Sequence, residues 1–223
     1  MATQENTQEF SMSAVDKSTA FIEKNKKIFI GVIAAIIIVV GGIYAYQTLV
    51  VKPNEEKASY LLSKGQDYFA LGNFDLALNG DKTDFTGFVN IAKKYSSTKA
   101  GNLANLYAGL SYAQKGDAKN AIKYLEEFSS KGDQMISPAA LAALGNCYAT
   151  DGNVDKAISL LKEAAAKADN NSLSPVFLLQ AGTLLESQKK TEEARKLYLE
   201  IKEKYPASAI SQNINKYIER ATK

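Results

Sequence analysis

The chain has few side chains that can do chemistry, and the most conspicuous is its single cysteine, Cys147. A thiol acts as a nucleophile or a metal ligand only with a base or further ligands beside it, and the sequence contains no histidine. The lack of histidine excludes histidine-based triads, His-containing zinc sites and imidazole acid–base catalysis. We therefore expect Cys147 to be a small buried residue, and we expect no enzyme, no catalytic residue, no metal site and no cofactor.

Two polar stretches match ligand or modification motifs only in part. Asp151 and Asp155 lie in the stretch DGNVD, which has too few ligands for a calcium loop and is better explained as a turn between helices. Asn170-Asn171-Ser172 matches a glycosylation sequon, and it equally matches a polar loop. The net charge of +3, without blocks of like charge, gives no indication of a nucleic-acid partner.

The strongest pattern is an internal repeat with the spacing G-x-x-Y-x-x-x-G-x-x-x-x-A. Its four copies are Gly65, Tyr68, Gly72 and Ala77; Gly109, Tyr112, Gly116 and Ala121; Gly145, Tyr148, Gly152 and Ala157; and Gly182, Leu185, Lys189 and Ala194. The successive alanines are 44, 36 and 37 residues apart, which is the scale of a helix–turn–helix unit. The longer first interval indicates an insertion near residues 79–88.

Each copy predicts two antiparallel helices joined by a short turn. The second glycine of the motif can end the first helix, because it adopts a left-handed conformation at little steric cost. The first glycine is expected to face the alanine of the partner helix, Gly65 facing Ala77 and Gly109 facing Ala121, so that the two backbones approach closely. Apolar residues recur at helical spacing on one face from Ala121 of the second copy and from Ala194 of the fourth, and those faces are expected to form the core.

These residues resemble the tetratricopeptide repeat (TPR) family, whose motif has a small residue, an aromatic residue, an alanine and a final proline at the same relative places. The resemblance covers about Lys57 to Pro206, although the tryptophan typical of the family is missing throughout. It implies an all-α fold, with a TPR solenoid of about four helix pairs over residues 57–206. A capping helix is expected over residues 207–223, where one stripe is apolar: Ile210, Ile214, Tyr217, Ile218 and Ala221.

In TPR proteins the first helix of each pair lines a groove. By their offset from the first glycine, the resemblance places these positions there: Ser59, Leu62, Gln66, Phe69, Leu103, Leu106, Leu110, Ala113, Ala139, Ala142, Asn146, Ala149, Val176, Leu179, Thr183 and Glu186. We predict that partner binding involves Leu62, Phe69, Leu103, Leu106, Leu110, Asn146, Val176, Leu179 and Thr183. Only Glu186 is charged, so the basic set with which TPR co-chaperones grip a C-terminal carboxylate is absent. We expect the groove to receive an apolar or extended polypeptide; alternatively, the same leucines pack on the insertion or on a neighbouring helix.

A second pattern precedes the repeats, where the run from Ile28 to Val51 carries no charge. A helix of about 20 apolar residues spans the core of a bilayer. The run is too long for a cleavable signal peptide and is not followed by a small-residue cleavage site. We therefore interpret residues 24–52 as a transmembrane signal-anchor. A buried core helix is disfavoured because the apolar character runs all the way round.

Charges near the span favour one orientation. Lys24, Lys26 and Lys27 precede it, and this cluster favours a cytoplasmic N-terminus. Residues 1–23 are short and polar, so we expect them to be a flexible cytoplasmic tail, with the repeats on the far side of the membrane. Within the span, Gly31 and the Gly41-Gly42 pair could let another helix approach closely; alternatively, they only reflect the general frequency of glycine in transmembrane helices.

The order of tail, single span and extracytoplasmic repeats is similar to that of a bacterial family, the YfgM-like ancillary subunits of the SecYEG translocon. This resemblance implies an inner-membrane protein with a periplasmic domain that pairs with a membrane-anchored chaperone of the PpiD type and assists client polypeptides. It implies protein partners and the membrane, and no nucleic acid. The alternative is a scaffold for another cell-envelope assembly machine, because the same fold would serve it. An enzyme is disfavoured, because no acid–base or metal constellation assembles.

Overall fold

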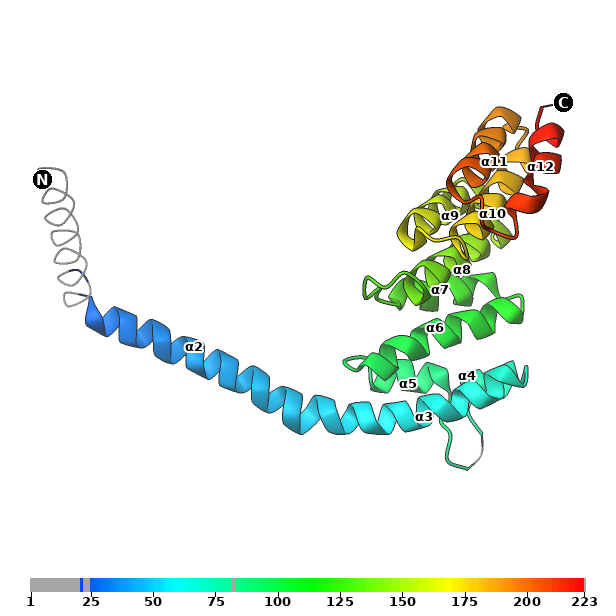
Figure 1. Ribbon diagram of the computed structural model, residues 1–223. Helices are drawn as coiled ribbons and strands as arrows, with labels where there is room; N and C mark the ends of the chain where they lie inside the picture. Colours follow the sequence, from blue (N-terminus) through cyan, green and yellow to red (C-terminus); the bar gives the residue numbers. More distant parts are fainter. Residues whose placement is uncertain (1–20, 22–24, 82, 223) are drawn as a thin grey trace, which may run out of the picture. The chain divides into compact units, whose positions relative to one another are not determined.

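The computed structural model describes residues 21, 25–81 and 83–222 (Figure 1). Throughout that part of the chain every regular element is a helix, which confirms the predicted all-α class. The chain divides into two compact units, Met1–Pro53 and Asn54–Lys223, and each is described by itself. The tail predicted over residues 1–23 lies outside the described residues, except for Phe21.

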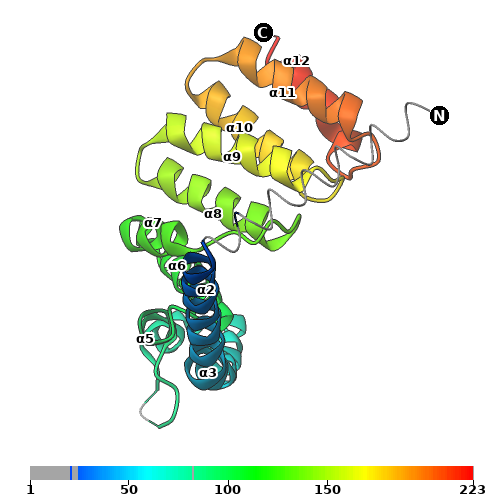
Figure 2. The ribbon, with the colours of Figure 1, turned by 90° about the vertical axis from the view of Figure 1, so that its left-hand side faces the viewer.

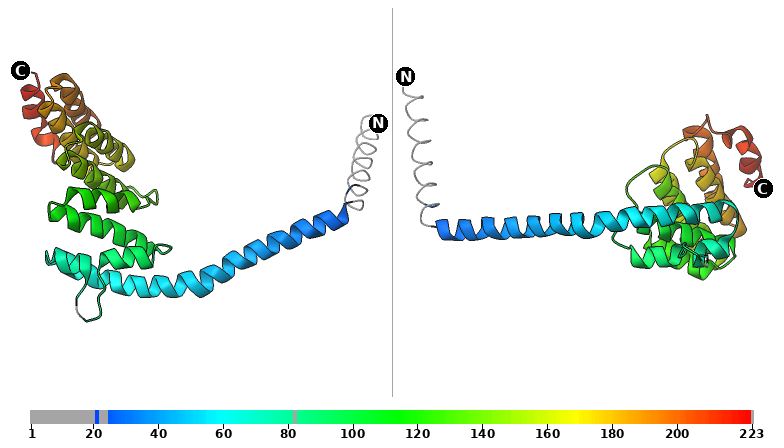
Figure 3. Two further views of the ribbon diagram at one scale, coloured as in Figure 1. Left: turned by 180° about the vertical axis from the view of Figure 1, so that it is seen from behind. Right: turned by 90° about the horizontal axis from the view of Figure 1, so that it is seen from below.

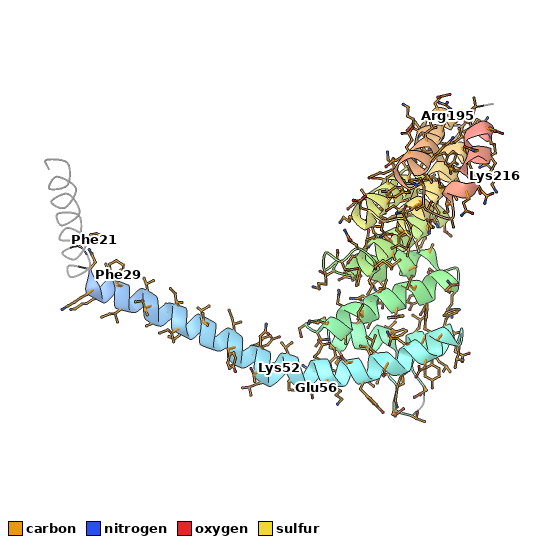
Figure 4. All side chains as sticks on the ribbon, viewed as in Figure 1. Phe21, Phe29, Lys52, Glu56, Arg195 and Lys216 are labelled. Carbon is orange, nitrogen blue, oxygen red and sulfur yellow. The ribbon has the colours of Figure 1, made fainter. Side chains whose placement is uncertain are left out.

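The first unit is built around α2, Lys26–Tyr46, which continues into a π-helical turn, η1, Gln47–Val51. Among the described residues, the helical stretch that begins with α2 is the one long and apolar enough to cross a membrane. None of the residues of α2 is buried, and its side chains stand clear of the ribbon (Figure 4). The predicted candidate span is therefore present as a single helix.

The helix does not end at Pro53, where a proline would normally interrupt it. The N–H of Lys52 bonds to the carbonyl of Gln47, five residues back, so the π-helical turn shifts the hydrogen-bond register just before the proline. Pro53 is then the second residue of α3, Lys52–Ala70. The helical stretch consequently continues to Ala70.

The second unit is a stack of helix pairs. The pairs are α3 with α4 (Phe74–Asn79), α6 (Lys99–Gln114) with α7 (Ala118–Glu127), α8 (Ile136–Thr150) with α9 (Val154–Ala168), and α10 (Ser174–Ser187) with α11 (Thr191–Lys204). A short helix, α5, Phe88–Lys94, lies between the first pair and the second. Each pair packs on the next along the chain, as Figure 2 and Figure 3 show from two sides.

The turn inside each pair is the same in all four copies. The second motif position has a positive φ, of 74° at Gly72, 77° at Gly116 and 90° at Gly152. The next residue donates its N–H to the carbonyl five residues earlier, at 2.8 to 3.0 Å, which is the bond that closes a Schellman motif. Lys189 takes the glycine's place in the fourth copy and still adopts a φ of 62°. The predicted turns are therefore present even where the glycine is absent.

The expectation that the first glycine faces the motif alanine is wrong in three of the four copies; only at Gly145 does an added Cβ meet that alanine, at 3.2 Å from the Ala157 carbonyl oxygen. A Cβ on Gly109 would lie 2.6 Å from Cγ of Leu125, and a Cβ on Gly182 would lie 2.3 Å from Cε1 of Tyr198. Both neighbours stand four residues after the alanine, one helical turn further along. In these two copies the glycine therefore makes room for a large side chain of the partner helix, while the alanine is buried separately at 0 % exposure.

The C-terminal cap is shorter than the predicted 207–223. A 3₁₀ turn, η2, Ser211–Asn213, leads into α12, Ile214–Arg220. Ile214 and Ala221 are buried in the core of the last two pairs, and Ile210, Tyr217 and Ile218 pack against that core half-buried. The predicted apolar stripe is therefore the buried side of this segment.

Candidate functional site

The first helices of the pairs come together around an apolar hollow of about 480 Å³, which we call the α6–α8 hollow. It is lined by Gln66, Leu103, Leu106, Tyr107, Leu110, Met135, Ile136, Ala139, Ala140 and Leu173. These residues lie on or directly before α3, α6, α8 and α10, so all four pairs contribute. The volume is in the range of pockets that hold ligands or side chains.

The hollow offers almost no unpaired polar side chain to a ligand. Gln66 and Tyr107 carry the polar side-chain groups of its lining, and the Gln66 amide donates to the Tyr107 hydroxyl at 2.9 Å. Two large apolar side chains at its edge remain open to solvent, since Met135 is 57 % exposed and Ile136 is 50 % exposed. The arrangement can take up apolar groups and holds no charged partner for a carboxylate.

An aspartate just before α8 fixes this exposed edge. Asp133 Oδ1 accepts the N–H groups of Met135 at 2.9 Å and Ile136 at 2.5 Å, and Oδ2 accepts the Ser137 hydroxyl at 2.5 Å. These bonds, with the Ser137 hydroxyl first among them, lower the pKa of Asp133 to about 2. The carboxylate therefore stays ionised and holds the turn that presents Met135 and Ile136.

The structure brings three of the predicted groove leucines into the hollow, namely Leu103, Leu106 and Leu110. The three side chains differ in how deeply they are buried. Leu106 is only 7 % exposed and belongs to the core formed by α6, α7 and α8. Leu103 and Leu110 are half-buried, so they combine packing with access to the hollow.

Two groove positions of α3 are instead used for packing. Leu62 is 6 % exposed and lies in the first core cluster. The ring of Phe69 packs edge-on against Phe74 and against Tyr107, with centroids 5.5 and 5.4 Å away. Leu62 therefore packs within the fold, as the alternative to a groove position predicted. Phe69 packs against Tyr107, which lines the hollow.

Asn146 does not line the α6–α8 hollow; it lies beside a smaller hollow of about 270 Å³, which Leu110 and Cys147 also line. Cys147 is 5 % exposed, and burial raises the pKa of its thiol. A protonated, buried thiol is a poor nucleophile. No group of three or more potential metal ligands occurs in the described ranges.

The last groove positions are tied to the C-terminal helices. Val176 and Leu179 pack half-buried against the last core, and the Thr183 hydroxyl donates to the Leu179 carbonyl at 2.9 Å. Glu186 accepts hydrogen bonds from Arg220 of α12 and, at 2.9 Å, from the Tyr198 hydroxyl; the Arg220 bonds are the main cause of its lowered pKa. The single charge predicted in the groove is thus paired within the fold.

Sequence reasoning missed five residues of the lining: Tyr107, Met135, Ile136, Ala140 and Leu173. A signal for two of them was present, because Ile136 and Leu173 both stand nine residues before the first glycine of their copies. They escaped notice because they precede the span of the motif.

The DGNVD stretch and the Asn170-Asn171-Ser172 sequon both make hydrogen bonds within the fold. Asn153, within DGNVD, caps α9 by accepting the Lys156 N–H, and Asp155 accepts from Gln188 and Lys190 at 3.0 and 3.2 Å. Asn170, in the sequon, accepts the N–H groups of Ser172 and Leu173 and so shapes the loop before α10. Both stretches therefore act as turns or loops between helices.

Comparison with models of protein families identifies a match over most of the chain. The family model described as a tetratricopeptide repeat-like domain matches residues 19–219, nearly the whole chain. No curated protein matches it. The match extends over both the apolar helix and the helix pairs, so the two units belong to one family pattern.

Proposed function

The chain belongs to the tetratricopeptide repeat-like family, and from this premise we propose that it is a membrane-anchored module that binds an apolar segment of another polypeptide. Such domains are generally protein-interaction modules. The observation that carries the proposal is the α6–α8 hollow, with Met135 and Ile136 exposed at its edge. Exposed large apolar side chains around an apolar hollow are typical of protein-binding surfaces.

The anchor supports the proposal energetically. If α2 lies in a bilayer, the helix pairs are confined near that surface together with other membrane proteins. Confinement raises the effective concentration of a partner, so a contact over one small hollow is enough for useful occupancy.

Within this class, the proposed role is that of an ancillary subunit of the Sec translocon. The protein would act in the bacterial inner membrane, with a cytoplasmic N-terminus and periplasmic helix pairs, beside SecYEG and a chaperone of the PpiD type. The hollow would hold apolar stretches of client polypeptides as they emerge. This role is supported by the order of apolar helix and repeats and by the lysines before the span.

The test is affinity capture of the full-length chain from mildly solubilised native membranes, followed by mass spectrometry. The informative variant is Ile136→Asp, because Ile136 begins α8 and an acidic residue is tolerated in the first turn of a helix. The matched control is Leu71→Asp, since Leu71 is 75 % exposed and does not line the hollow. We expect translocon subunits and a periplasmic chaperone with the wild type, and client polypeptides reduced at least about tenfold in Ile136→Asp only.

The outcomes separate the candidate roles. Wall-synthesis or outer-membrane assembly proteins in place of translocon subunits would move the function to the scaffold alternative. Equal capture by Ile136→Asp and Leu71→Asp would contradict binding in the hollow. Protease digestion of intact and opened spheroplasts tests the orientation, because a periplasmic domain is cut as soon as the outer membrane is removed.

A further inference from the structure

A third hollow, distinct from the two described above, lies between α3 and α5 and is rich in lysine. It has a volume of about 660 Å³, and Lys57, Lys93 and Lys94 line it together with Asp84, Thr86 and Asn90. We call it the basic pocket. Lys57 comes from the start of α3, and the other two lysines come from the last turn of α5.

The charge of this pocket is not cancelled from within. Its carboxylate, Asp84, is paired with Lys64, and that bond is the first cause of the lowered pKa of Asp84. Glu55, two residues before Lys57, is also hydrogen-bonded elsewhere. Its carboxylate accepts the N–H groups of Lys99 and Ala100 at 2.6 and 3.0 Å. Three lysines therefore surround the hollow with no carboxylate of its lining left free for them.

The position of Lys57 along the chain suggests the occupant. Lys57 follows Val51, the last residue of the uncharged run, by six residues of helix, or about 9 Å. The headgroup layer continues for several ångströms beyond the hydrocarbon core, and charges act over about 10 Å at physiological salt. Chain connectivity alone thus keeps one wall of the pocket within reach of lipid headgroups.

We propose that the basic pocket binds the phosphate of an anionic phospholipid from the bilayer that holds α2. The chemistry is that of a phosphate received by lysine ammonium groups, and the source is the membrane surface. This proposal rests on the membrane placement of α2 in the proposed function, and it is independent of what the α6–α8 hollow binds.

The test uses the full-length chain in nanodiscs of zwitterionic lipid, with and without phosphatidylglycerol, and a third sample of zwitterionic nanodiscs with inorganic phosphate. Amine acylation followed by mass spectrometry reports the access of each lysine. We expect Lys57, Lys93 and Lys94 to be labelled about fivefold more slowly with phosphatidylglycerol, and the effect to fade at high salt. The exposed Lys196 and Lys202 of α11 serve as internal controls.

A paired variant checks that the lysines act together. In Lys93→Gln/Lys94→Gln the protection of Lys57 is expected to fall, whereas Lys196→Gln/Lys202→Gln leaves it unchanged. Equal labelling with and without phosphatidylglycerol in a bilayer-integrated chain would overturn the lipid proposal alone. Equal protection by inorganic phosphate would also overturn it, because the occupant would then be a free anion. Failure of the chain to integrate would overturn both this proposal and the membrane anchor.

Discussion

The first helix pair differs from the three pairs after it in the residues that pack against the first motif glycine. In the later pairs the motif glycine receives a side chain from its own partner helix, such as Leu125 opposite Gly109 and Tyr198 opposite Gly182. In the first pair, Gly65 instead receives the rings of Phe88 and Phe85, which come from α5 and from the loop before it. The glycine therefore lies where a large side chain packs against the first helix, and that side chain can come from different elements.

The cause of this difference is the length of α4. The position four residues after Ala77 is Asp81, and α4 ends at Asn79, so the residue equivalent to Leu125 lies in a loop. Asp81 accepts the hydroxyl of the motif residue Tyr68 at 2.8 Å and the N–H groups of Thr83 and Phe85. The inserted segment thus replaces half of a helix by an aspartate-centred turn and two phenylalanines.

The largest effect is expected from removing the substitute ring. Phe88 is 0 % exposed, so Phe88→Ala should lower the free energy of unfolding of residues 54–223 by about 3–5 kcal/mol. The measurement is urea unfolding followed by circular dichroism. The control is Val89→Ala, at a half-buried neighbouring residue, which should lower the free energy of unfolding by clearly less. Similar losses for the two variants would mean that Phe88 is not the substitute that the comparison requires.

A smaller effect is expected from filling the glycine positions. A Cβ on Gly65 would lie 2.4 Å from the buried ring of Phe88, whereas a Cβ on Gly145 meets its nearest neighbours at 3.2 Å. We expect Gly65→Ala to lower the free energy of unfolding by about 1–3 kcal/mol. In Gly145→Ala, the helix preference of alanine offsets most of the strain. Unfolding of both variants under the same conditions checks this. A Gly145→Ala loss as large as that of Gly65→Ala would contradict the difference between the pairs.

The fourth turn allows a change in the opposite direction. Lys189 holds a left-handed conformation that glycine adopts without strain, so Lys189→Gly should raise the free energy of unfolding by up to about 1 kcal/mol. Gly116→Ala, at the equivalent position of the second pair, should lower it by a similar amount. A stabilising effect of both substitutions would contradict the shared turn geometry.

The smallest expected effect depends on pH and belongs to the first pair. Backbone hydrogen bonds from Phe85 and Thr83 are the main causes that hold the pKa of Asp81 well below its usual range. Because the folded pKa is depressed, the stabilisation is present above the unfolded pKa of about 4 and is lost as the pH falls through the folded value. We expect the stability difference between the wild type and Asp81→Asn to shrink below about pH 4. A difference that stays constant down to pH 2 would show that the Asp81 charge is irrelevant.

Much of the fold follows from local sequence, because the turn is a backbone property. A glycine seven residues after the motif glycine is enough to predict a left-handed end to a helix, and even Lys189 follows the pattern set by its neighbours. The partners of the first glycines were not predictable in the same way. They depend on which large side chain arrives from another element, and for Gly65 that element is the insertion.

The hollow was predictable in part for a related reason. Leu103 and Leu110 recur at fixed offsets on the first helices, so their shared face could be inferred. The roles of Met135 and Ile136 depend on where α8 begins, and that point is set by the hydrogen bonds of Asp133. Leu106 illustrates the limit, since its offset is that of a groove residue while its burial is that of the core.

The central claim is that the α6–α8 hollow binds apolar polypeptide segments, and site-specific photo-crosslinking tests it most directly. A photoreactive amino acid is placed at Ile136 or, as a control, at Leu71 in the full-length chain, and membranes are irradiated during active protein export. If the hollow binds such segments, cross-links to other polypeptides form from position 136 and few form from position 71. Equal cross-linking from both positions, or none from position 136, would contradict it.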